Sequence, residues 1–204
     1  MDNKKNLDSL KKFIIDYEIK NAPRPLEFAG NVVLFESINN STLKAKGHII
    51  VHGGCGKSKL ISENGSVFLL FGSMQEANIS AGQNIFVKHT QNSILKAKSD
   101  IIIENSVFKS ELYAGNKIIS ESFDAKIIGG KITAGKEVVI NSIGNEQGVE
   151  TFVTVLEKEG FVLADAVYPG TNIALWKLNG IRIKTHIKSK TKFFVKDNQI
   201  AFNS

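Results

Sequence analysis

Hydrophobic and polar positions alternate with a period of two along most of the chain, and the alternation recurs every 16–20 residues. Between residues 28 and 143 each repeat has a short β-branched run, a polar break, a small residue and then an aliphatic residue two positions later. Alternation with period two indicates strands, and the Gly, Asn and Ser clusters between the runs indicate turns. We find no helical period in this region, so the pattern predicts strands alone.

The aliphatic position shows the repeat most clearly, and its members are Leu43, Leu60, Ile79, Leu95, Leu112 and Ile132. The small residues two positions earlier are Ser41, Ser58, Ala77, Ser93, Ser110 and Gly130. Short strands repeated at this period predict a solenoid whose coils stack at the strand spacing of about 4.8 Å. Coil length drifts and does not keep a six-residue register, which favours a right-handed helix. We therefore predict an all-β protein, with a right-handed parallel β-helix of six to seven coils over residues 27–148.

The stretch "HGGCGKSK" at residues 52–59 has the composition of a phosphate-binding loop. Such a loop needs a glycine where this chain has Val51, and a helix after the lysine, whereas "LISENGSVFLL" predicts strand, turn and strand. Ser58 also belongs to the column of small residues. We interpret the stretch as a corner of the solenoid and not as a nucleotide site.

The two ends of the chain differ from the repeat. Residues 1–26 are predicted to form an amphipathic helix and a linker, because Leu7, Leu10, Phe13, Ile14 and Tyr17 share one helical face and "APRP" stops the helix. Such a helix either caps the first coil or binds a partner. Residues 149–204 are predicted to form an antiparallel strand region, with a hairpin signal at Asn179-Gly180.

Basic side chains occupy every second position of one C-terminal segment, and these are Arg182, Lys184, His186, Lys188, Lys190 and Lys192. On an extended strand they share one face, opposed by Ile181, Ile183, Ile187 and Phe193. Two interpretations are open. The basic residues are a candidate site that binds an anion or a protein partner, or they are a solvated strand face that protects a sheet edge. Without interleaved aromatic residues, single-stranded nucleic acid is disfavoured, and an anionic membrane surface is not favoured either.

Composition narrows the class of protein. The net charge of +6 is concentrated at the ends of the chain, mainly the C-terminal end. One cysteine excludes an internal disulfide framework, no apolar run is long enough for a membrane span, and the N-terminus lacks the apolar segment of a secretory signal. We expect a cytoplasmic protein.

Residues suited to catalysis are sparse in the repeat. Asp100 and Asp124 lie in different coils, and His48 and His52 are spaced about 13 Å apart on a strand. Cys55 is expected to be a buried small hydrophobe. We therefore expect no enzyme activity, no metal site, no cofactor and no small-molecule substrate.

Residues 100–155, "DIIIENSVFKSELYAGNKIISESFDAKIIGGKITAGKEVVINSIGNEQGVETFVTV", resemble the β-helix region of the bacterial flagellar assembly protein A (FapA) family. The resemblance rests on Ala114-Gly115, on "IIGGKITAGKEV" at 127–138 and "SIGNEQGVETFVTV" at 142–155, and on "VYPGTNIAL" at 167–175. It implies a cytoplasmic bacterial scaffold associated with flagellar assembly or its regulation. The C-terminal domain of the cell-division inhibitor MinC and the bactofilins resemble the same solenoid more distantly.

Three hypotheses for function follow. The first is a non-enzymatic scaffold that binds other proteins, with a homo-oligomer as one form. The second is a bactofilin-like element that stacks end to end. The third is an adaptor for polyanions or membrane surfaces that uses the basic segment 182–192.

Overall fold

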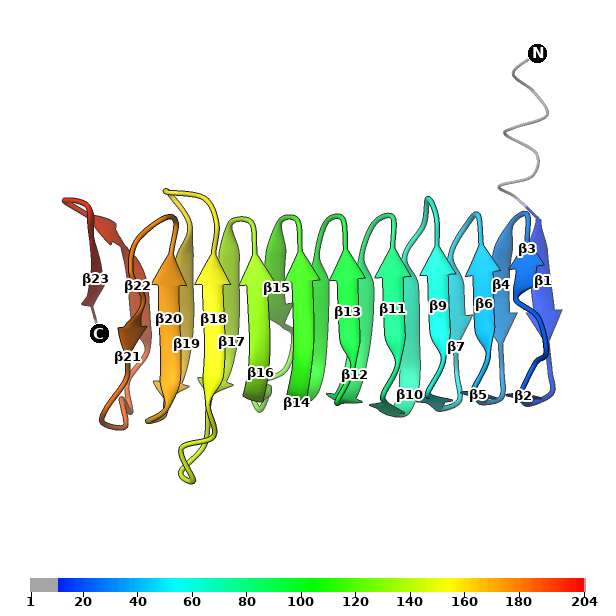
Figure 1. The fold of residues 1–204 in the computed structure, drawn as a ribbon, viewed down its shortest axis with the longest axis horizontal. Coiled ribbons are helices and arrows are strands. Elements are labelled where there is room, and N and C mark those ends of the chain that lie inside the picture. The colour runs from blue at the N-terminus through cyan, green and yellow to red at the C-terminus, as the bar shows by residue number, and fades with distance from the viewer. Residues whose placement is uncertain (1–10, 204) are drawn as a thin grey trace, which may run out of the picture.

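Strands make up all the regular structure in the computed structural model, which describes residues 11–203, apart from the side chains of 71–74, and contains no helix in that range. The strands wind into a long parallel β-helix (Figure 1). In Figure 1 the strands nearest the viewer run upward and the chain returns down the far side while it advances from right to left, which is the right-handed sense. The predicted all-β class and the parallel β-helix are confirmed.

Each coil has two long faces and one short face. The first long face contains β1 (Lys12–Ile15), β4 (Asn31–Leu34), β7 (Ile49–Val51), the starts of β10 (Val67–Gln75), β12 (Ile85–Gln91) and β14 (Ile101–Ala114), then β15 (Lys117–Ser120) and the starts of β17 (Glu137–Ile143) and β19 (Phe161–Val167). The second long face contains β3 (Leu26–Phe28), β6 (Thr42–Ala45), β9 (Lys59–Ser62), β11 (Asn78–Ala81), β13 (Ile94–Ala97), the ends of β14 and β16 (Lys126–Ala134), β18 (Thr151–Val155) and β20 (Thr171–Leu175). The short face contains β2 (Ile19–Lys20), β5 (Ile38–Asn39) and β8 (Cys55–Gly56), and continues through parts of β10, β12, β14, β16, β17 and β19.

These pairings define nine coils in the described part of the chain, so the predicted number of six to seven was too low. The parallel pairing begins at β1 and ends at β20, and it crosses both predicted boundaries, after residue 26 and after residue 148. Residues 151–175, which we expected to pair antiparallel, belong to the last two coils.

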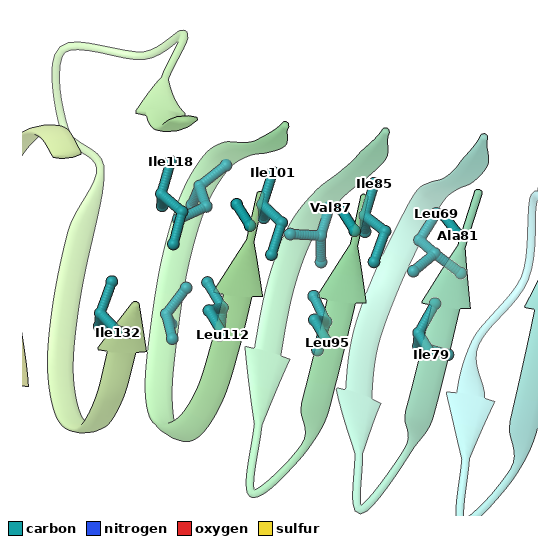
Figure 2. Packing of buried hydrophobic residues seen from close by; sticks show 14 of the residues in the cluster. Leu69, Ile79, Ala81, Ile85, Val87, Leu95, Ile101, Leu112, Ile118 and Ile132 are labelled. Atoms are coloured by element: carbon teal, nitrogen blue, oxygen red, sulfur yellow. The ribbon is translucent and has the colours of Figure 1, made fainter. Parts of the chain in front are cut away.

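The interior is filled by columns of aliphatic side chains, one residue from each coil. Figure 2 shows Ile79, Leu95, Leu112 and Ile132 from the second long face opposite Ile85, Ile101 and Ile118 from the first. Each of these side chains is at most 1% exposed. The period-two pattern of the sequence therefore identified the residues of the core correctly.

The column of small residues stabilises one corner of the solenoid. The Ser93 hydroxyl donates a hydrogen bond to the Gln91 carbonyl oxygen (2.8 Å) and accepts one from the backbone N–H of Ala77 in the preceding coil (3.1 Å). Ser41, Ser58, Ser110 and Thr151 make equivalent pairs of bonds. The residue before each serine has a positive φ, as at Asn92 (48°), and this sharp turn aims the hydroxyl along the solenoid axis.

Glycine opens several coils because neighbouring backbones approach closely there. A Cβ at Gly135 would collide with the carbonyl oxygen of Gly115, and a Cβ at Gly115 would collide with that of Lys98. Only glycine fits such positions without moving the preceding coil.

The predicted N-terminal helix is wrong for the part of it that the structure describes. Phe13 and Ile14 lie in β1, and Ile15 on the same strand is 5% exposed in the core. Pairing of β1 with β4 satisfies the backbone and outweighs the helical spacing of the apolar residues. Tyr17 and Ile14 are 65% and 62% exposed, and Leu7 and Leu10 lie outside the described residues.

Three antiparallel strands cover the C-terminal coil. β21 (Ile181–Arg182) pairs with β20, β22 (Thr191–Lys196) pairs with β19, and β23 (Gln199–Asn203) pairs with β22. Phe193 of β22 is fully buried against the last coil. The predicted antiparallel region is therefore confirmed for residues 181–203.

Candidate functional site

The structure separates the six predicted basic site residues instead of aligning them on one strand. Arg182 lies in β21 and Lys192 lies in β22. Between them, Ile183 exchanges backbone hydrogen bonds with Gly170 and Thr171, and Ile187 forms an isolated bridge with Val167. Ile183 and Phe193 point inward as predicted, at 8% and 0% exposed. The bend after Arg182 breaks the period of two, so no continuous basic ladder forms.

Three of the six make local contacts. Arg182 pairs with Glu150 at 3.5 Å, and the Lys192 ammonium lies 4.0 Å from the centre of the Phe161 ring. The His186 ring stacks on Tyr168 with 4.0 Å between centres. These contacts tie the C-terminal strands to the solenoid, which is a structural role for half of the predicted site.

The other three, Lys184, Lys188 and Lys190, are exposed. Lys190 lines a cavity of about 260 Å³ together with Asp165 and Glu121. The three lysines distribute positive charge over the surface and do not form an organised pocket for a single anion.

A polar hollow of about 680 Å³ lies beside the loop after Gly144. Asn141 is central to it, because its amide oxygen accepts a hydrogen bond from the Ser120 hydroxyl (2.9 Å) and its amide nitrogen donates one to Asp165 (3.0 Å). Asp124 and Glu146 both line this hollow, which the sequence did not reveal. Such a surface can hydrogen-bond polar groups of a partner.

The histidines and Cys55 have local structural partners. The backbone N–H of Ser66 donates to His48 Nδ1 (2.9 Å), His52 stacks on Phe35 (4.8 Å between centres), and His89 bonds Ser106 (3.0 Å). In the described part of the chain, no group of three or more His, Cys, Asp or Glu residues is placed to hold a metal ion.

Cys55 is 1% exposed, and burial raises the pKa of its thiol to about 12. Its prediction as a buried small hydrophobe is confirmed. It lies in β8, within the stretch 52–59, and β9 follows. Lys57 sits between them with φ 46°. The interpretation of this stretch as a solenoid corner is therefore confirmed.

The feature that sequence analysis missed is an outward-facing column of apolar residues on the first long face. Every coil contributes one residue, and backbone pairing places the nine in register. We call this set the outer apolar column: Ile14, Val33, Ile50, Phe68, Phe86, Ile102, Ile119, Val139 and Leu163. The rings of Phe68 and Phe86 stack with 4.6 Å between centres. Beside the column, Phe35 and Leu70 add side chains that are 49% and 43% exposed.

The second long face has no such column. Its corresponding outward residues are Glu27, Lys44, Ile61, Ser80, Lys96, Tyr113, Thr133, Thr154 and Ala174, and most of them are polar. Glu27 and Lys44 form an ion pair at 2.9 Å, which raises the pKa of Lys44. Because both faces share one core, the difference between them does not arise from the packing of the interior.

A sequence signal for the outer apolar column existed. Strands of the first long face read "NVVL", "IIV", "VFLL", "IFV" and "EVVI", while strands of the second read "TLKA", "NISA" and "ILKA". Continuous apolar runs are typical of strands that are covered on both sides, and alternation is typical of strands with one wet side. The repeat fixes the inward positions of both faces, whereas the continuous apolar runs mark the outward positions of the first long face alone.

Comparison with known proteins gives the family. Residues 25–159 match the family model of the flagellar assembly protein A (FapA) β solenoid domain, which spans more than half of the chain. The chain therefore belongs to the FapA β solenoid family, as the resemblance at residues 100–155 predicted. Searches of curated proteins and of solved structures returned no match. Across the described residues, no helix is long and apolar enough to cross a membrane.

Proposed function

We propose that this protein is a non-enzymatic scaffold that acts in flagellar assembly or its regulation by binding protein chains along its first long face. The outer apolar column carries this proposal. The strip continues through all nine coils: Ile14 is 62% exposed, Val33 and Ile102 are 4% and 7% exposed, and the other six residues are partly exposed. Contiguous apolar surface marks sites of protein interaction. Family membership supports the flagellar link.

The organisation of the face also supports the proposal. Polar pairs flank the column on both sides, with Lys88–Glu104 at 3.2 Å and Lys117–Glu137 at 2.9 Å. An apolar centre with a polar rim is the usual anatomy of a protein interface. A rigid solenoid holds such a face flat over its whole length.

The two alternative functions have weaker support. End-to-end stacking needs bare coils at both ends, whereas β21 and β22 pair with the strands of the last coil and β23 pairs with β22. A polyanion adaptor needs an organised basic surface, and three of the six basic residues are engaged in contacts within the chain.

A genetic test separates the flagellar link from the role of the face. The gene is deleted in the source bacterium, flagella per cell are counted by electron microscopy, and the strain is complemented. We expect loss or misplacement of flagella, rescue by the wild-type chain, and no rescue by a Phe68→Lys/Phe86→Lys double variant. The matched control, Thr133→Lys/Thr154→Lys, adds the same charge to the second long face and should rescue.

Normal flagella in the deletion strain would refute the flagellar link. Full rescue by the Phe68→Lys/Phe86→Lys variant would refute the role of the outer apolar column.

A further inference from the structure

We propose that the occupant of the first long face is a second copy of this chain, so that two solenoids pack face to face as a two-fold symmetric dimer. This inference rests on the proposed function of that face as a protein interface, and it names the partner. The outer apolar column and its polar rim carry the argument.

The strands of the first long face have the composition of strands that are covered on both sides. In β7 and β12 the outward residues Ile50 and Phe86 are as apolar as their inward neighbours Ile49 and Ile85, which are fully buried. Parallel strands acquire such continuous apolar runs where a second layer packs on the sheet. Neighbouring side chains already bury Val33 and Ile102 of the column, at 4% and 7% exposed, but the other seven outward residues are at least partly exposed in the described chain, and a second layer would cover them.

The size of the face matches what a dimer needs. Nine coils at about 4.8 Å make a column about 38 Å long, and the flanking outward residues lie about 13 Å apart across it. A face of these dimensions covers about 500 Å² per copy, or about 1,000 Å² for two copies. This total is the lower bound for a stable biological interface.

The shape of the face suits a copy of itself. A two-fold axis near Phe86, the fifth of the nine residues, places the column of one copy along the column of the other, in opposite directions. Phe86, whose ring stacks on that of Phe68, then meets its own counterpart at the centre of the interface, and Phe68 faces Ile102 of the second copy. Aromatic residues at the centre of an interface contribute most of its stability.

The charges on the rim also favour self-association over a strongly charged partner. Lys88 pairs with Glu104, and Lys117 pairs with Glu137, both within the chain. The charges within each of these two pairs cancel, so this part of the rim does not require a partner of opposite charge. At the C-terminal end of the column, Lys192 pairs opposite Leu163 and closes the apolar strip.

The test is molar mass in solution by light scattering, across a concentration series from about 1 to 200 µM at low and high salt. We expect the wild-type chain to reach twice its mass of 22.4 kDa, with little dependence on salt. The Phe68→Lys/Phe86→Lys variant should stay at 22.4 kDa, and the Thr133→Lys/Thr154→Lys control should dimerise like the wild type. Circular dichroism and the urea midpoint establish that each variant is folded, and Ile119→Lys replaces the double variant if that does not fold.

A wild-type monomer at the highest concentration would overturn the dimer, as would a dimer that persists in the folded face variant. Masses that grow without limit would also overturn it, because they indicate stacking of coils end to end. The flagellar test has an independent outcome. If the wild-type chain is a monomer and the Phe68→Lys/Phe86→Lys variant fails to rescue, the dimer is refuted and the proposed function stands. If the chain is a dimer and the deletion strain has normal flagella, only the flagellar function is refuted.

Discussion

In the column of small residues, two substitutions are expected to change the free energy of unfolding in opposite directions: Ser93→Ala should lower it and Ala77→Ser should raise it. Ser93→Ala removes a hydroxyl that donates to the Gln91 carbonyl and accepts from the Ala77 N–H. Ala77 is 2% exposed, so its N–H loses its partner where water does not reach it. Leaving one buried polar group without a partner costs about 1–3 kcal/mol of the free energy of unfolding, and we expect a loss in that range.

Ala77→Ser supplies the hydroxyl that the column lacks. Glu76, before it, has φ 54°, close to the φ of 48° at Asn92 before Ser93, so the two corners have the same shape. The new hydroxyl is positioned to accept from the Ser58 N–H and to donate to the Gln75 carbonyl. We expect a gain of about 0.5–1.5 kcal/mol, which is the net value of ordinary hydrogen bonds.

The assay is urea unfolding followed by far-ultraviolet circular dichroism, with the free energy taken from the midpoint and slope. Ser80→Ala is the matched control, because Ser80 faces outward on β11, and it should change stability by less than about 0.5 kcal/mol. A neutral Ser93→Ala, or a destabilising Ala77→Ser with an unchanged slope, would refute the argument that this column stabilises the corner through hydrogen bonds.

Four further predictions test the fold and its interior. Gly135→Ala should lower the free energy of unfolding in urea by more than about 2 kcal/mol, because its Cβ meets the Gly115 carbonyl. Gly54→Ala is the control and should be tolerated, because the atom nearest to its Cβ is 3.5 Å away. Equal effects of the two substitutions would contradict the close stacking of coils. Lys57→Asn should raise the free energy of unfolding by up to about 1 kcal/mol, because asparagine accepts the φ of 46° more readily; a loss would show that the corner is not strained. Cys55, whose thiol pKa rises from 9.0 to about 12 on burial, should react with iodoacetamide only after unfolding, and fast native labelling would contradict its burial. Since the fold favours the neutral thiol, its contribution to stability is complete below pH 9.0 and is lost as the pH rises towards about 12, which urea midpoints across that range measure.

The interior could be predicted from the sequence because a solenoid repeats one short rule. Leu95 and Leu112 stand at the same step of adjacent coils, and both are fully buried as that step requires. The number of coils could not be counted, because coils at the two ends depart from the rule. The first begins at β1 without an opening glycine, and the last two carry longer turns.

The candidate site was harder to predict because it depends on what lies side by side across coils. Phe68 and Phe86 stack although 18 residues separate them, and only the register between β10 and β12 brings them together. Conversely, the alternating basic residues predicted a shared face that requires a straight strand. The chain bends after Arg182 to cover the last coil, and local alternation carries no information about that bend.

The most direct test of the central claim is a distance between copies, measured by double electron–electron resonance on spin labels in a Cys55→Ala background. One label is placed at Lys88→Cys, beside the centre of the outer apolar column, and the control label is placed at Lys96→Cys, on the second long face. Because packed sheets lie about 10 Å apart, two solenoids joined through the first long face should give an inter-copy distance below about 30 Å at position 88 and a longer one at position 96. A shorter distance at position 96, or no inter-copy distance at position 88, would contradict the assignment of the first long face as the interface.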